Sequence, residues 1–153
     1  MNRLPHFIII GAMKAGTTSL YHYLRLHPEV AMSRKKETSF FLQHNFSKGL
    51  GWYQRQFPPD DRVKGEATTS YTKYPAQRGV AERIYQTLPG VKLIYVLRDP
   101  INRTLSHIHH NLLKGYEQEH TWEKKLEDLR SPYIQCSLYY MQLEQYLRFF
   151  PPE

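Results

Sequence analysis

The sequence contains only one cysteine, Cys136, among 153 residues. A single thiol cannot form a disulfide within the chain, so the cysteine content gives no sign of an oxidising compartment, and we expect Cys136 to be a small buried apolar residue. Long apolar runs are also lacking. The longest near the N-terminus is Phe7 to Ile10, far shorter than the roughly 20 residues that span a bilayer, and no signal-peptide cleavage pattern accompanies it. These absences predict a soluble, cytoplasmic protein with no transmembrane segment.

Acidic residues are fewer than basic ones. The chain has 14 Asp and Glu against 21 Lys and Arg, which gives a formal net charge of +7. This excess favours anionic partners such as nucleotides, acidic sugars, nucleic acids or membrane surfaces, and does not choose among them. Repeats and low-complexity segments are absent, and 41% of the residues are hydrophobic. The composition therefore predicts one ordinary globular domain spanning 1–153.

Two short β-branched runs, at 6–11 and 91–97, predict fully buried strands. A weaker strand is predicted over 29–32 and a strand end with a loop over 63–71. Apolar spacing predicts helices over 17–26, 51–57, 77–88, 99–114, 122–129 and 137–150. Buried strands that alternate with helices indicate parallel βαβ units, hence an α/β three-layer sandwich with a central parallel sheet. Ligands of such sheets bind beyond the carboxyl ends of the strands.

The loop after the first strand has the pattern of an anion-binding loop. Gly11 and Gly16 keep the G-x-x-x-x-G spacing of a Walker A motif, but Thr17 and Thr18 follow where that motif has Lys and then Ser or Thr. The lysine lies inside the loop instead, as Lys14. Backbone N–H groups and the dipole of the next helix would attract a phosphate, and a glycine lets the backbone approach it. The displaced lysine disfavours a magnesium-dependent NTPase or nucleotide kinase.

The run F-I-I-I-G-x-x-K-x-G-T-T-S-L resembles the 5′-phosphosulfate loop of sulfotransferases, especially the carbohydrate and heparan-sulfate branch. Three later segments resemble motifs of that branch in the same order. They are Lys36 to Phe41 (K-E-x-x-F-F), Gly65 to Tyr71 (G-E-x-[ST]-P-x-Y) and Leu97 to Ser106 (L-R-[ND]-P-x-x-R-x-x-S). The resemblance implies a P-loop-like fold and transfer of a sulfuryl group from 3′-phosphoadenosine 5′-phosphosulfate (PAPS) to a hydroxyl or amine, with a carbohydrate as the expected acceptor and no metal.

The resemblance also implies how the donor would be held. The 5′-phosphate side would be bound by the loop and the first helical turn, through Lys14, Ala15, Gly16, Thr17, Thr18 and Ser19. Arg98 and Ser106 would bind the 3′-phosphate, since a guanidinium fits a phosphate with two parallel hydrogen bonds. That phosphate distinguishes the donor from ordinary adenine nucleotides, so these contacts would set cofactor specificity.

Two catalytic roles follow from the same resemblance. Lys14 would neutralise charge that grows on the bridging oxygen of the donor, and Glu37 would take the acceptor proton as general base. Glu66 is the reserve candidate, either as a carboxylate that supports the neighbouring site residues or for acceptor binding, and Ser70 is a further candidate for acceptor binding. Taken from the residues alone, Glu37 would be a solvated charge at the end of a basic run, so its role depends on the resemblance.

Two positions depart from the motifs of the branch, and several other polar residues are expected to have no catalytic role. Ala67 stands where some heparan-type members have Lys, and Thr69 stands where Pro is common, which weakens an assignment to heparan sulfate but not to the chemistry. Arg103 is expected to be a solvated charge on a helix face, and Asp99 a helix cap. The helix histidines have no nearby Cys or acidic residue to complete a metal site, so we expect them at the surface or lining a cleft: His107, His109 and His110.

Two other functional classes remain as alternatives. One is the magnesium-dependent P-loop kinase or NTPase; the other is a non-catalytic nucleotide- or nucleic-acid-binding module, which would show a basic patch with stacking aromatics. The informative basic residues lie at strand ends instead, so no nucleic-acid partner is expected. Members of the carbohydrate and heparan-sulfate branch that this sequence resembles are usually longer than 153 residues. We therefore expect the N-terminal part of a sulfotransferase, marginally stable, prone to associate and with little transfer of its own.

Overall fold

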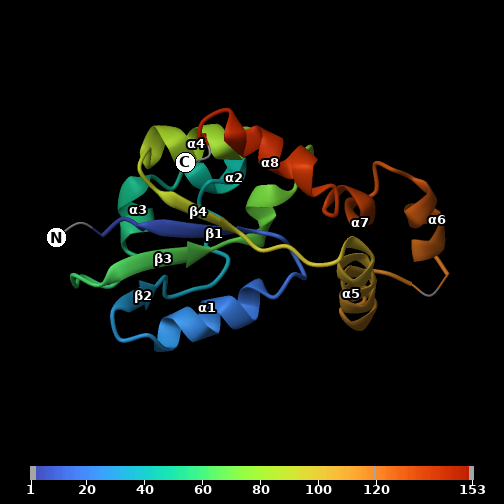
Figure 1. The fold of residues 1–153 in the computed structure, drawn as a ribbon, viewed down its shortest axis with the longest axis horizontal. Coiled ribbons are helices and arrows are strands. Elements are labelled where there is room, and N and C mark those ends of the chain that lie inside the picture. Colours follow the sequence, from blue (N-terminus) through green and yellow to red (C-terminus); the bar gives the residue numbers. More distant parts are fainter. Residues whose placement is uncertain (1–2, 119, 152–153) are drawn as a thin grey trace.

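A four-stranded parallel sheet lies at the centre of the molecule (Figure 1). The computed structural model describes residues 3–118 and 120–151. Its strands run in the order β2-β3-β1-β4, namely Val30–Met32, Val63–Ala67, Phe7–Gly11 and Lys92–Tyr95. In the middle strand, Ile8 lies opposite Glu66 of β3, and Ile9 opposite Ile94 of β4. The carboxyl ends of β1, β3 and β4 therefore meet at one edge of the sheet.

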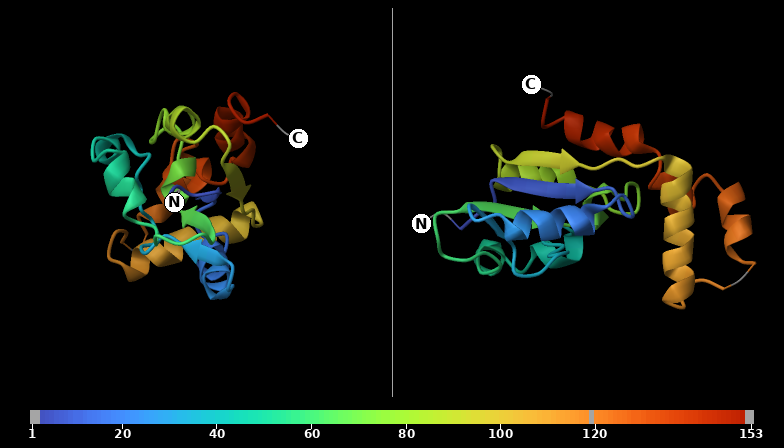
Figure 2. Two further views of the ribbon diagram at one scale, coloured as in Figure 1. Left: turned by 90° about the vertical axis from the view of Figure 1, so that its left-hand side faces the viewer. Right: turned by 60° about the horizontal axis from the view of Figure 1, so that its bottom comes forward.

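Helices cover both faces of this sheet (Figures 1 and 2). On one face, α1 (Thr17–Leu26) packs on a small core that contains Ile9 and Tyr21. On the other, Ile8 belongs to a larger aromatic core covered by α2 (Gln43–Phe46), α3 (Leu50–Gln54), α4 (Val80–Thr87) and α8 (Tyr139–Leu147). Because successive side chains of a strand point to opposite faces, β1 supplies both cores. The α/β three-layer sandwich expected from the sequence is confirmed.

A group of helices extends beyond the carboxyl ends of the strands. The long helix α5 (Pro100–Leu113) stands there across the direction of the sheet, with α6 (Trp122–Glu127) and α7 (Pro132–Gln135) beside it (Figure 2). Asp99 begins α5 as predicted, since its carboxylate accepts a hydrogen bond from the Asn102 N–H at 2.8 Å. None of the helices in residues 3–118 and 120–151 combines the length and apolar character of a membrane span.

Most expected elements lie within a few residues of the observed ones, and Cys136 is buried as predicted. One expectation is wrong: the segment 91–97 is not a fully buried strand. It forms β4 at the edge of the sheet, where Lys92 is exposed and the other three residues are half-buried. Its apolar composition is that of a central strand, so composition alone could not show which strand would be the edge. The short helices α2 and α7 were not predicted.

Candidate active site

The loop between β1 and α1 leads into an uncapped helix N-terminus. Gly16 is the N-cap of α1 and has a φ of 93°, in the left-handed region that glycine adopts without strain. No side chain caps this helix, and its first turn has no acidic residue. The first N–H groups of a helix have no intrahelical partner, so they are available to an anion. Thr18 and Ser19 are exposed beside them, whereas Thr17 is buried.

Lys14 lies within this loop and is bound by the segment that follows β4. The Lys14 carbonyl accepts a hydrogen bond at 3.1 Å from Nη1 of Arg98, 84 residues away in the sequence. Burial and the nearby charges of Arg98 and Lys36 lower the pKa of Lys14. The structure therefore concentrates positive charge at the carboxyl ends of two adjacent strands, where an anion would relieve the repulsion. Ser106 lies two turns along α5 and is partly exposed.

Arg103 is completely buried, so its expected position on a solvated helix face is wrong. Its guanidinium donates to the Ser137 hydroxyl and the Tyr133 carbonyl, each at 2.5 Å, and reaches the Met13 carbonyl at 3.5 Å. Burial lowers the pKa of Arg103. These contacts join α5 and the α7 segment to the loop that contains Lys14. Helical spacing alone could not show that a second helical segment would cover this side chain.

His107 is also buried, which corrects its expected place at the surface or in a cleft. Its ring packs edge-on against Tyr133, with 4.7 Å between the centroids, and its Nδ1 lies 3.4 Å from Nη1 of Arg103. Burial, with the charge of Arg103, lowers the pKa of His107 to about 3, so the ring is neutral. His109 is exposed and His110 partly exposed. Among the described residues, no group of three or more His, Cys, Asp and Glu is placed to hold a metal.

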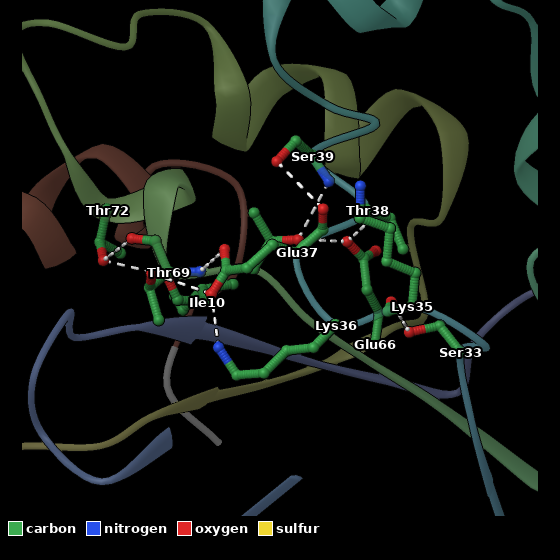
Figure 3. A network of polar contacts seen from close by, with 11 residues as sticks. Ile10, Ser33, Lys35, Lys36, Glu37, Thr38, Ser39, Glu66, Thr69 and Thr72 are labelled. Atoms are coloured by element: carbon green, nitrogen blue, oxygen red, sulfur yellow. Dashed lines mark hydrogen bonds and ion pairs between the residues drawn. The ribbon is translucent and has the colours of Figure 1, made fainter. Parts of the chain in front are cut away.

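Glu37 lies in the loop after β2, and its carboxylate is bound by Lys36 and Thr69 (Figure 3). Its side chain is 34% exposed, and Lys36 Nζ lies 2.5 Å from Oε1. The turn η1 (Thr69–Thr72) supplies two further donors, because the Thr69 N–H donates to Oε2 at 2.9 Å and the Thr69 hydroxyl to Oε1 at 3.1 Å. The backbone of Glu37 has a φ of 61°, unusual for a residue with a side chain. The contacts of Glu37 with Thr69 were not foreseen from the sequence.

Glu66, near the end of β3, is fully buried. Its carboxylate accepts hydrogen bonds from four hydroxyls, those of Thr38, Tyr53, Thr68 and Tyr71. Burial raises the pKa of Glu66, and the hydroxyls oppose that shift. The side chain of Glu66 has no exposed surface, and its hydroxyl partners include Thr38 and Thr68, one from each of the two motif segments. Ser70, expected near the acceptor, is partly exposed on η1.

The comparison with protein families gives one match that covers almost the whole chain. Residues 4–153 match the family model of the sulfotransferase domain. The chain belongs to this sulfotransferase family. The resemblance drawn from the four motifs is therefore confirmed at the level of the family.

Individual relatives of this sulfotransferase chain agree with that assignment. It is 40% identical over 114 residues to "Membrane-associated sulfotransferase kil1" of Dictyostelium discoideum, covering 71% of this chain and 23% of the relative. It is 30% identical over 166 aligned positions to the mouse "Heparan sulfate glucosamine 3-O-sulfotransferase 5", and the alignment covers 100% of this chain and 47% of the relative. A solved sulfotransferase from Alicyclobacillus acidocaldarius superposes with a TM-score of 0.79 at 28% identity. The superposition covers 96% of this chain and 69% of the solved one. The chain thus spans less than half the length of these two curated relatives.

Proposed function

We propose that residues 1–153 form one sulfotransferase domain that binds PAPS and transfers its sulfuryl group to a hydroxyl or amine of a carbohydrate. The observation that carries this proposal is the hydrogen bond from Arg98 to the Lys14 carbonyl. It joins the loop after β1 to the segment after β4, and these are the two motifs assigned to the two phosphate groups of the donor. They meet where parallel sheets bind their ligands.

The residues at this edge fit a donor with phosphates at both ends of its ribose. The uncapped N-terminus of α1, the exposed Thr18 and Ser19, and Lys14 suit the 5′-phosphosulfate. A Cβ placed on Gly16 would meet no atom within 4 Å, so the backbone there is open to a close ligand. Arg98, with Ser106 on the following helix, would hold the 3′-phosphate. When bound, PAPS supplies an activated sulfuryl group attached to its 5′-phosphate.

Two residues of the chain would then have separate catalytic roles. Lys14 would stabilise negative charge on the bridging oxygen as the bond to sulfur breaks, which is the electrostatic role that phosphoryl-transfer enzymes give to cations. Glu37, partly exposed and with one lone pair of Oε2 directed away from Thr69, would take the proton of the acceptor. Ser70 is proposed to contact the acceptor, and Glu66 to hold the loops that carry Glu37 and Ser70.

A carbohydrate acceptor is proposed because several relatives are named as heparan sulfate sulfotransferases, and the chain has an excess of basic residues. No metal and no nucleic acid is part of the proposal. A cytoplasmic location stays a prediction, and the relative named as membrane-associated makes cell fractionation its natural test.

The test compares 3′-phosphoadenosine 5′-phosphate with adenosine 5′-monophosphate, which differ only in the 3′-phosphate. We expect Arg98→Ala to weaken the first about tenfold to a hundredfold, the value of one charge-assisted contact, and the second much less. Isothermal titration calorimetry measures both, with the exposed Arg25→Ala as the matched control. Equal losses for the two ligands, or tighter binding of ATP with magnesium than of either, would reject the proposed donor.

A further inference from the structure

Thr69 contacts both oxygens of the Glu37 carboxylate (Figure 3). Its N–H donates to Oε2 at 2.9 Å, and its hydroxyl donates to Oε1 at 3.1 Å. We propose that Thr69 is a positioning residue, which holds the carboxylate of Glu37 in the orientation that receives the acceptor proton. The inference rests on the proposed function, because it assumes that Glu37 is the general base.

Two donors from one residue fix a carboxylate in a way that a single donor cannot. A glutamate side chain has three rotatable bonds, and one hydrogen bond leaves the carboxylate free to rotate about it. Lys36 also binds Oε1, but lysine is a flexible point charge without directional preference. Within residues 3–118 and 120–151, the hydrogen bonds shown for Oε2 come from Thr69 alone. Thr69 therefore sets the plane of the carboxylate and leaves a second lone pair of Oε2 for the acceptor.

The turn that carries Thr69 is itself fixed to the donor loop. At the other end of η1, the Thr72 hydroxyl donates to the Ile10 carbonyl at 2.9 Å, immediately before the loop of Lys14. The approach is close, since a Cβ on Gly11 would lie 2.0 Å from that hydroxyl oxygen. One turn of four residues thus holds Glu37 at its start and the end of β1 at its finish. Base and donor loop are aligned through a short, rigid connection.

At this position the sequence departs from the motif that it resembles. The motif that Gly65 to Tyr71 resembles commonly has proline where this chain has Thr69. Proline has neither an N–H nor a hydroxyl, so neither hydrogen bond to Glu37 could form with it. The departure from the motif is therefore the feature that makes this contact possible.

The experiment measures kcat, KM for PAPS and the dissociation constant of 3′-phosphoadenosine 5′-phosphate in the protein. Thr69→Val keeps the shape and the N–H but removes the hydroxyl; we expect kcat to fall about tenfold, with both donor constants within about twofold. Thr69→Ser keeps both donors, so its kcat should stay within about threefold of wild type. Thr69→Pro removes both donors and should lower kcat further. Thr87→Val, which removes a similar hydroxyl bonded to the Arg83 carbonyl on α4, is the matched control.

A double-mutant cycle separates positioning from a general structural effect. Glu37→Gln alone should lower kcat by about 10²–10⁴-fold, the usual share of a general base. Adding Thr69→Val to it should cost nothing more, because Thr69 acts through the carboxylate that is already lost. Additive losses, unchanged kcat in both Thr69→Val and Thr69→Pro, or an equal loss in Thr69→Ser would overturn the inference. If wild type does not bind 3′-phosphoadenosine 5′-phosphate more tightly than adenosine 5′-monophosphate, the proposed function is overturned, and this inference with it.

Discussion

Lys14 and Glu37, the two residues proposed for catalysis, both have left-handed backbone conformations, with φ of 67° and 61°. Such a conformation costs a residue with a side chain roughly 1–3 kcal/mol, and it persists only where neighbours enforce it. Here the neighbours are visible: Arg98 binds the Lys14 carbonyl, and the Glu37 N–H donates to the Ala67 carbonyl at 2.8 Å. Strain of this kind gathers at functional sites, which supports the choice of these two residues.

His107 gives a prediction about pH at the scale of one residue. Its pKa is lowered to about 3 in the folded protein, from the 6.5 of an unfolded chain. Above pH 6.5 the ring is neutral in both states; as the pH falls toward 3, only the unfolded chain takes up the proton, so stability is lost. The loss at pH 5 should be about 2 kcal/mol.

We expect His107→Asn, whose amide oxygen can accept from Arg103 as Nδ1 does, to remove that part of the pH dependence. Urea unfolding of the wild type and the variant at pH 7 and pH 5 measures it, and the exposed His109→Asn is the control. If His107→Asn and wild type lose the same free energy between the two pH values, then His107 is not neutral in the folded state.

At the scale of elements, Arg103 connects α5 to the α7 segment and to the donor loop. Arg103→Met keeps much of the side-chain volume but leaves the carbonyls of Tyr133 and Met13 without this donor. We expect the free energy of unfolding to fall by about 2–4 kcal/mol, because the buried Tyr133 carbonyl keeps only the hydrogen bond from the Thr104 hydroxyl and the packing around the guanidinium loses its polar contacts. Urea denaturation followed by circular dichroism checks this, against His109→Ala on the same helix. A gain in stability would mean that desolvating the guanidinium costs more than its hydrogen bonds return.

The elements themselves could be predicted well, and their contacts less so. Helix 17–26 and the strand near 6–11 follow from local periodicity and from Gly11 and Pro28, which are properties of neighbouring residues. The edge position of β4 and the burial of Arg103 depend on which distant segments pack against them. The same holds for the contacts of Glu66 and Thr69, which join loops about 30 residues apart. The motifs located the site, but only the fold could show which motif residues touch one another.

On the scale of the whole molecule, one apolar stripe lies open to solvent. Ile101 and Leu105, 69% and 52% exposed, lie one turn apart on α5, and Leu97, 54% exposed, lies in the segment just before that helix. Exposed apolar patches of this kind promote association. We expect the chain to self-associate as its concentration rises, and Ile101→Lys to reduce this association, as measured by sedimentation velocity. An exposed control away from the stripe is Tyr23→Lys on α1. Monomeric sedimentation of the wild type at all concentrations would contradict this expectation.

The turn η1 and the helix α5 fix different parts of the proposed site. Thr69 and Thr72 fix the proposed base relative to the end of β1, so this part of the geometry depends on contacts within the first 72 residues. Nothing in that connection passes through α5, α6 or α7, which lie beyond the ends of the strands. Substitutions on the outer surfaces of those helices can therefore leave the contacts of Thr69 and Thr72 unchanged, whereas Arg103 of α5 reaches the Met13 carbonyl and so joins α5 to the loop of Lys14. The proposed base thus depends on the turn η1, and the donor loop depends in addition on a helix residue 90 positions further along the chain.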